Sequence, residues 1–371
     1  MKHLLLFILI TTFFIGCSIK QPEVNIKLPN KSNVDINTKL QAQNVDEEIG
    51  VFENIDIIEG DISSLDDKES MKIAFIYPSR IVAKYAKSSM NTILAYLDYK
   101  KIKFEIKVFD TLNEDDTNIQ NAISNARDEG FTNVIALFTP KATTYLHTLD
   151  TSALKVYLPL TNKNNITFTN DNFIYGAISY KDQIKKLLEY SSINNTMFYQ
   201  SSFLGDKIKS LYDSIAFDVK VVKEIKKSKN YYKGIVKDYR IKNSTLFLNT
   251  PIVKTSILLS QLRAYNIYPK VILSTQINYN PRILVLTQVK DRSNFVIANS
   301  IDKVDDELKD TLDMYGSDVL YNWVDYSTLV GINYLYDHNN SGLIKTEIID
   351  NEVIYEPKLY KTTAYGFLEI K

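Results

Sequence analysis

Few residues of this 371-residue chain could carry out acid–base or metal chemistry, and they are far apart in the sequence. After His3 the only histidines are His147 and His338, and no H-E-x-x-H run places two of them on one helix face. No zinc site is expected, and each histidine is interpreted as a solvated or capping residue. A serine triad would need one of these two as its base, and the chain contains no G-x-S-x-G run.

Three pairs of adjacent aspartates could suggest glycoside hydrolysis, which uses two carboxyl groups. The pairs are Asp66-Asp67, Asp115-Asp116 and Asp305-Asp306. Adjacent acids at a helix start or on a polar segment are usually solvated or favoured by the helix dipole. Only 11 glycines are present, and no G-x-G-x-x-G or G-x-x-x-x-G-K-[ST] run could hold a phosphate. The sequence therefore predicts a non-catalytic protein without a metal or cofactor.

Polar residues at the carboxyl ends of the expected strands are the remaining candidates for binding. In open α/β sheets the ligand crevice lies beyond these ends, where helix N-termini present free amides. Because Ser, Thr and Asp also cap helices for local reasons, a purely structural role is the alternative for each candidate. The ligand-binding candidates are Ser79, Thr139, Thr143, Thr144, Tyr180 and Asp182, with Tyr77, Thr161 and Thr250 at equivalent positions.

The elements that must position these residues begin at Met71. Apolar strands are expected over 72–77, 104–109, 134–138, 155–160 and 173–178, with amphipathic helices after the first two. Gly130 stands where a helix ends and a left-handed cap residue is favoured. Alternation of this kind predicts a parallel sheet with right-handed crossovers.

The segment 173–190, FIYGAISYKDQIKKLLEY, changes from strand-like to helical spacing. Gly176 inside the strand-like part suggests a bend or a close backbone approach. Asp182 stands where the helix N-terminus favours a negative charge. We interpret this segment as a hinge, at which the chain leaves one α/β lobe and enters a second.

The second lobe repeats the scheme, with strands expected over 196–199, 219–225, 246–248, 271–273 and 295–298. Thr250-Pro251 is the predicted start of a helix in this lobe. A long helix with an apolar face from Val319 to Tyr334 is expected to return to the first lobe, and a hairpin is expected around Asp350-Asn351. The predicted first lobe is 71–180 with about 300–338, the second is 181–299, and 339–371 is a C-terminal hairpin and strand.

The N-terminus has the pattern of an export signal. Lys2 and His3 precede an apolar run that is too short to span a bilayer and ends at Phe14-Ile15-Gly16-Cys17. This resembles the lipobox of bacterial lipoproteins, although Phe14 replaces the usual leucine. The resemblance implies a signal peptide over 1–16, lipidation of Cys17, the only cysteine, and, because Ser18 follows, palmitate-type anchoring in the outer membrane facing the periplasm. An uncleaved anchor or an ordinary signal is the alternative, and either would also export the chain.

Residues 17–70 are predicted to be a flexible tether, because Phe52 is their only aromatic residue and no apolar period is sustained. Some fifty such residues would span about 40 Å as a coil. The alternative is that residues 51–62 add a strand to the folded part. Lys plus Arg equals Asp plus Glu, 44 of each, so charge gives no indication of a nucleic-acid partner.

From about residue 71 to the end, the chain resembles the type I periplasmic-binding-protein fold, in which crossing strands join two α/β lobes. The resemblance rests on KIAFIYPS, on VIALFTP followed by Thr143-Thr144, on the 173–190 segment and on YGSDVLYNWVDYSTLVGINYLYD. Together with the lipobox, it is similar to lipoproteins related to the penicillin-binding-protein activators. Ser79-Arg80 replaces the Ser-Gly pair of amino-acid receptors, and their glycine loop after the third strand is also missing.

The resemblance implies two classes of function. In the first, an envelope lipoprotein uses its bilobal domain to bind a partner protein and regulates a cell-wall synthase. In the second, the protein captures a small solute for an ABC importer. The 25 tyrosines could stack on sugars or on a partner, although most are expected in core or boundary positions.

Overall fold

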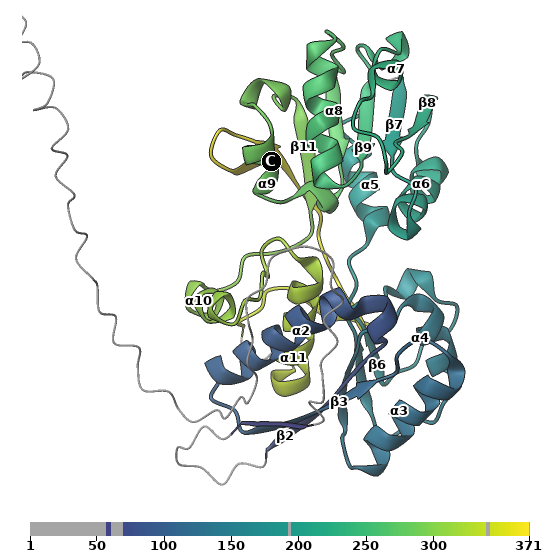
Figure 1. Ribbon diagram of the computed structural model, residues 1–371. Helices are drawn as coiled ribbons and strands as arrows, with labels where there is room; N and C mark the ends of the chain where they lie inside the picture. The colour runs from purple at the N-terminus through teal and green to yellow at the C-terminus, as the bar shows by residue number, and fades with distance from the viewer. Residues whose placement is uncertain (1–56, 61–69, 192–193, 339–341, 371) are drawn as a thin grey trace, which may run out of the picture. The chain divides into compact units, whose positions relative to one another are not determined.

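The computed structural model describes residues 57–60, 70–191, 194–338 and 342–370 (Figure 1). The predicted signal peptide, the predicted lipid attachment at Cys17 and most of the predicted tether lie outside these residues. Two mainly parallel sheets, each covered by helices, make up the rest, so the predicted α/β fold with two lobes is confirmed.

The first sheet has eight strands in the order β1-β3-β2-β4-β5-β6-β13-β12. Strands β2 to β6 run parallel, and only the two ends of the sheet carry antiparallel pairs. Their apolar runs are buried because helices cover both faces of the sheet. The strands are β1 (Ile57–Gly60), β2 (Met71–Tyr77), β3 (Phe104–Asp110), β4 (Asn133–Ala136), β5 (Lys155–Leu158), β6 (Phe173–Tyr175), β12 (Ile348–Ile349) and β13 (Glu352–Val353).

Strand β1 belongs to the segment for which the sequence left two alternatives. It pairs antiparallel with β3, Ile57 opposite Lys107 and Gly60 opposite Phe104. The alternative that residues 51–62 add a strand is therefore confirmed for these four residues, and the tether predicted for 17–70 has to exclude them.

Helices of the first lobe pack on both faces of this sheet (Figure 1). The longest, α2, packs against α11 and α10, and α11 also contacts β4 and β5. On the opposite face, apolar residues of α3 and α4 pack with Ala74, Ile76 and Val134 of the sheet. The helices are α2 (Ser79–Tyr99), α3 (Asp116–Asp128), α4 (Pro140–Leu146), α10 (Asp306–Met314) and α11 (Trp323–Asp337).

The second sheet has seven strands in the order β15-β14-β11-β10-β9-β7-β8. Helix α5 packs against α6, β11 and β14, whereas α8 packs against α7 and α9. The strands are β7 (Asn195–Tyr199), β8 (Val219–Glu224), β9 (Thr245–Asn249), β10 (Val271–Ser274), β11 (Phe295–Asn299), β14 (Lys358–Thr362) and β15 (Phe367–Ile370). The helices are α5 (Tyr180–Leu188), α6 (Phe203–Ile215), α7 (Lys233–Val236), α8 (Ile252–Ala264) and α9 (Arg282–Leu286).

Several local predictions are confirmed. Gly130 has a left-handed φ of 80° just after α3, and Asp350 and Asn351 have φ values of 48° and 62° in the turn that joins β12 to β13. Helix α11 packs in the first lobe, as expected. His147 and His338 occupy the C-cap positions of α4 and α11.

Several element boundaries differ from the sequence prediction, and the strands expected over 134–138 and 155–160 end at Ala136 and Leu158. The strand expected over 173–178 ends at Tyr175, and the helix expected from Val319 begins at Trp323, where the Asn322 side chain accepts a hydrogen bond from the Val324 amide. Thr250 does not cap α8, because its hydroxyl bonds that of Thr255 at 2.7 Å and Pro251 takes the cap position.

Strand β6 ends at Tyr175 because other side chains come close to the backbone of Gly176. A Cβ atom on Gly176 would overlap the Tyr157 hydroxyl and would lie 2.8 Å from Ser327 Oγ. The Gly176 carbonyl accepts hydrogen bonds from Ser327 Oγ at 2.8 Å and from the Tyr355 hydroxyl at 2.6 Å. The close backbone approach predicted for this glycine is thus confirmed.

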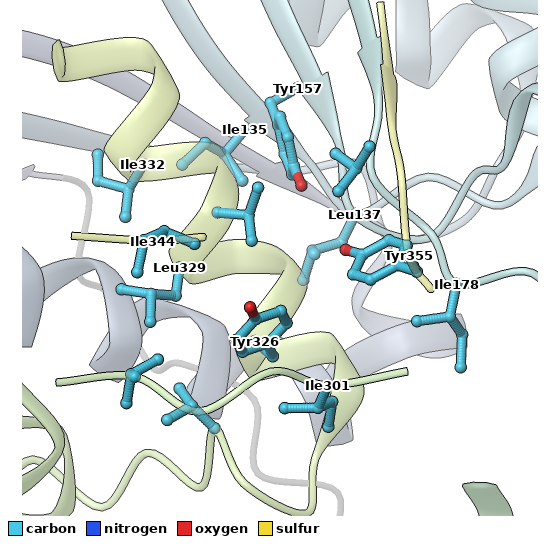
Figure 2. Close-up of a cluster of buried hydrophobic side chains, with 14 of the residues drawn as sticks. Ile135, Leu137, Tyr157, Ile178, Ile301, Tyr326, Leu329, Ile332, Ile344 and Tyr355 are labelled. Atoms are coloured by element: carbon cyan, nitrogen blue, oxygen red, sulfur yellow. The ribbon is translucent and has the colours of Figure 1, made fainter. Parts of the chain in front are cut away.

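The same tyrosine explains a second glycine, in the middle of α11. Figure 2 shows Tyr157, Tyr326, Tyr355 and Leu329 in one buried cluster. Gly331 faces the Tyr157 ring so closely that a Cβ atom would overlap three of its carbons. Helix α11 can therefore lie against β5 only with a glycine at this position.

We expect Gly331→Ala to lower the free energy of unfolding by about 1–3 kcal/mol, because the new methyl group overpacks against Tyr157. This loss opposes the higher helix propensity of alanine, about 1 kcal/mol. Urea denaturation would measure the change. Gly234→Ala in α7 is the matched control: no atom lies within 4 Å of its Cβ position, so stability should stay unchanged or rise slightly. Equal stability of the two variants would contradict the close contact.

A buried carboxylate in the first turn of α11 gives the fold a pH dependence. Asp325 is buried, its Oδ2 accepts the Asp318 amide at 3.0 Å, and its Oδ1 has no hydrogen-bond partner among the described residues. Burial raises the pKa of Asp325 from 3.8 to about 6, and the charge of Asp318 adds to the rise. Compared with the unfolded chain, the native state therefore keeps Asp325 protonated up to a higher pH.

Because the folded-state pKa of Asp325 exceeds the unfolded one, its contribution to stability is complete below about pH 4 and is lost as the pH rises through about 6. We expect Asp325→Asn to remove this loss, which is about 3 kcal/mol for a rise of about two pKa units. Urea denaturation at pH 4, 5.5 and 7.5 would measure it. Asp310→Asn, at an exposed position of α10, is the control and should keep the wild-type dependence.

Candidate functional site

The carboxyl edge of the first sheet holds two acids that the sequence analysis missed. Ser79, the first residue of α2, is buried, and its amide donates to Asp110 Oδ1 at 3.0 Å. Thr139, the N-cap of α4, donates its amide and its hydroxyl to the two carboxylate oxygens of Glu114, at 2.7 and 2.6 Å. At the start of each of these two helices, a backbone amide therefore already donates to a carboxylate of the same lobe.

The two threonines of α4 have different environments. The Thr143 side chain is fully buried and its hydroxyl lies 2.8 Å from that of Thr161, which in turn bonds the Phe138 carbonyl at 3.1 Å. Thr144 is exposed, and its hydroxyl bonds the Pro140 carbonyl of its own helix at 2.9 Å. Neither hydroxyl is free for a ligand in this arrangement.

The two candidates on the hinge helix α5 are also separated. Tyr180 is buried, and burial raises the pKa of its hydroxyl above the ordinary value. Asp182 is half-buried; its amide donates to Ser179 Oγ at 3.2 Å and its carboxylate lies 3.6 Å from Lys185 Nζ. With Asn162 and Glu352 it lines a cavity of only about 90 Å³. The six candidates therefore do not converge on one open site, and their role in ligand binding stays a prediction.

The carboxyl edge of the second sheet carries a buried network of amide side chains. Gln183 Nε2 donates to Gln276 Oε1 at 2.9 Å and to Ser300 Oγ at 2.8 Å. Asn249 Oδ1 accepts from the amide and hydroxyl of Thr275 at 3.2 and 2.8 Å. The Gln183 bonds tie α5 to the residues after β10 and β11, and the Asn249 bonds tie the end of β9 to the residue after β10.

Some atoms of this edge are left without a partner. Among the described residues, the buried atoms Gln200 Oε1, Asn249 Nδ2, Gln276 Nε2 and Asn278 Oδ1 make no hydrogen bond. Buried polar groups are normally paired, and an unpaired one costs about 1–3 kcal/mol. All four follow or end strands β7, β9 and β10. The second lobe therefore offers donors and acceptors at the edge where the sequence analysis placed a ligand.

The second-lobe residues could have been found by the rule that selected Thr250. Asn249 directly follows the expected strand over 246–248 and ends β9, and Gln276 comes after the expected strand over 271–273. Asp110 likewise ends β3. Most of the candidates chosen from the sequence were Ser and Thr, because these residues often cap helices. Asn249, Gln276 and Asp110 were therefore not among them.

Exposed apolar residues occur in two neighbouring segments of the second lobe. They are Val285 and Leu286 of α9, Val289 after it and Tyr365 of the β14–β15 turn, which are 87, 44, 52 and 98% exposed and are called the α9 patch below. Arg292 links its two parts, because its guanidinium donates to the Thr287 carbonyl at 2.9 Å and to the Thr363 carbonyl at 2.8 Å. Figure 1 shows α9 beside the β14–β15 hairpin. Clustered exposed apolar side chains mark binding surfaces more often than isolated ones do.

The described residues hold no group of three or more His, Cys, Asp or Glu side chains arranged to bind a metal ion. His147 Nε2 lies 3.2 Å from the Tyr175 hydroxyl, and burial lowers the pKa of the imidazole. Over the same part of the chain, every helix is too short or too polar to cross a bilayer.

Comparison with solved structures identifies the architecture. The branched-chain amino-acid binding protein LivJ from Streptococcus pneumoniae, in complex with isoleucine, is 11% identical with a TM-score of 0.56, over 81% of this chain and 100% of LivJ. A putative branched-chain amino-acid transporter protein from Rhodospirillum rubrum is 9% identical with a TM-score of 0.62, over 81% and 100%. The chain has the type I periplasmic-binding-protein fold.

The same fold is found in a protein of the other expected class. Full-length LpoA from Haemophilus influenzae, a penicillin-binding-protein activator, is 11% identical with a TM-score of 0.57, and the match covers 81% of this chain but 59% of LpoA. No protein-family model matches the sequence, and no curated protein matches it either. At these identities the comparisons show the fold, which solute-binding proteins and an activator share.

We expect Thr143→Val to lower the free energy of unfolding by about 1–2 kcal/mol, because it leaves the buried Thr161 hydroxyl without its neighbour. Thr144→Val on the exposed side of α4 should change stability by less than about 0.5 kcal/mol. Thermal and urea denaturation would measure both. A ligand whose binding was lost in the Thr143 variant at unchanged stability would contradict the structural role.

Proposed function

We propose that this chain is a non-catalytic lipoprotein of the cell envelope whose bilobal domain binds a partner protein, a cell-wall synthase that it regulates. The exposed α9 patch is the observation that carries the proposal, because a surface of Val, Leu and Tyr side chains has a use when a partner covers it. Tyr365, at the tip of the β14–β15 turn, is the aromatic anchor of the interface.

Two further features support this proposal. The first-lobe candidates are occupied by hydrogen bonds within the protein, which leaves little of that edge for a solute. The lipobox-like sequence at Cys17 and the following tether would hold the domain at the outer membrane, facing the periplasm, with reach toward a synthase.

The solute-capture function is the second candidate, and a different observation favours it. The four unpartnered amide atoms at the edge of the second sheet could bind the polar groups of a small ligand. The match also extends over the whole of LivJ. In this case the protein would deliver a solute to an ABC importer.

Capture of a synthase by the full-length protein tests the first proposal. A penicillin-binding synthase that is cross-linked to the protein in cells can be identified by its covalent labelling with fluorescent penicillin. We expect the double variant Val285→Asp/Tyr365→Asp to reduce the labelled band about tenfold, because it places charges in the apolar interface. Phe217→Asp, an exposed aromatic position after α6, is the matched control and should keep the band.

Absence of a penicillin-labelled partner, or equal capture by both variants, would contradict the proposal. A thermal-shift screen with amino acids and peptides distinguishes solute capture, the second candidate function, from binding of a partner protein. A ligand that binds only the folded state raises the melting temperature. A clear rise with a free solute, without synthase capture, would favour solute delivery.

A further inference from the structure

A cavity of about 530 Å³ lies beside the connections between the two sheets, apart from the strand-end candidates. Its walls come from segments far apart in the sequence, including the end of β11, the residues before α11, and β14 and β15. Ligand sites of small molecules have volumes of about 300–1,000 Å³. This cavity is therefore large enough for a bound molecule.

Four aromatic rings meet at this cavity. Tyr279 lies at their centre, with its ring centroid 4.4 Å from Phe367, 5.0 Å from Tyr360 and 5.8 Å from Tyr321. All four side chains are half-buried, so part of each ring surface remains accessible. Burial raises the pKa of Tyr279, and the neighbouring Tyr360 adds to the rise, so its hydroxyl stays protonated and can donate. Ring faces of this kind stack on flat rings and on the apolar faces of sugars.

The charged residues of the cavity are not balanced. Lys358 pairs with Asp302, and Glu369 lies near enough to Lys358 to raise its pKa. Lys303 and Lys345 also line the cavity, are exposed, and form no ion pair with any described residue. The lining therefore carries three ammonium groups and two carboxylates, a net charge of +1. The ammonium groups of Lys303 and Lys345 lie at the rim of an aromatic cavity, and ammonium groups bind carboxylates and phosphates.

We propose that this cavity binds a small anion that carries a six-membered ring with an apolar face. The ring stacks among Tyr279, Tyr321 and Tyr360, and the acidic group is bound by Lys303 and Lys345. A sugar acid and an aromatic carboxylate share this chemistry. The site is independent of the α9 patch and of the strand-end candidates, so it adds a ligand to either proposed function.

Calorimetric titration of the full chain tests the site, with glucuronate and 4-hydroxybenzoate as probes. Glucose and 4-hydroxybenzamide are their uncharged counterparts. We expect at least one acid to bind, and its uncharged counterpart to bind about tenfold more weakly, because a charge-assisted hydrogen bond is lost. Preference for one acid identifies whether the ring is a sugar or an aromatic one.

Variants locate the binding. Lys303→Gln/Lys345→Gln should weaken binding of the acid about tenfold, and Tyr321→Leu about three- to tenfold. Lys233→Gln/Lys242→Gln removes the same charge from exposed second-lobe positions and should leave the affinity unchanged. Melting temperatures of all variants control for folding. Failure of both acids to bind at up to about 10 mM, or equal affinity of the two double variants, would overturn the proposal.

Discussion

The two lobes depend on one shared acceptor, the carbonyl of Gly176, where the chain leaves the first sheet. Ser327 from α11 and Tyr355 from the C-terminal segment both donate to it, and the Tyr157 hydroxyl lies 3.3 Å from Ser327 Oγ. Two donors that lie 151 and 179 residues after Gly176 in the sequence therefore meet at its peptide unit. Because the site is buried, a hydroxyl that lost this carbonyl would have no water to replace it. The absence of a side chain at positions 176 and 331 is what allows this approach.

Beyond this junction the two sheet edges differ in how their polar groups are satisfied. In the first lobe, Asp110 and Glu114 bind the starts of α2 and α4, so the hydroxyls that sequence reasoning assigned to a ligand are used internally. In the second lobe, Gln183 bonds Gln276 and Asn249 accepts from Thr275, yet Gln276 Nε2 and Asn249 Nδ2 remain unpaired. The two sheet edges of a type I periplasmic-binding-protein fold need not contribute equally to binding. Here the strand-end atoms that lack a hydrogen bond lie in the second lobe.

Sequence reasoning could predict those features that depend on local pattern. The alternating strands and helices, the left-handed Gly130 and the turn at Asp350-Asn351 follow from composition and spacing over a few residues. It could not predict that Thr143 would be buried against Thr161, or that β6 would stop at Tyr175, because both depend on side chains from other elements. The cavity around Tyr279 could not be predicted for the same reason, since Tyr321, Lys345 and Phe367 approach it only after the chain has folded.

The fold does not by itself decide between a receptor and a regulator, since LivJ and LpoA both match this chain at 11% identity. The decision rests on which surfaces carry unused binding capacity. A solute needs convergent polar groups, and the second-sheet edge supplies four unpaired atoms, all of them buried. A partner protein needs accessible apolar area, and the α9 patch supplies it without any rearrangement. Accessible apolar atoms can be covered at once, whereas the buried amides must first be exposed, and the proposal of a partner protein rests on this difference.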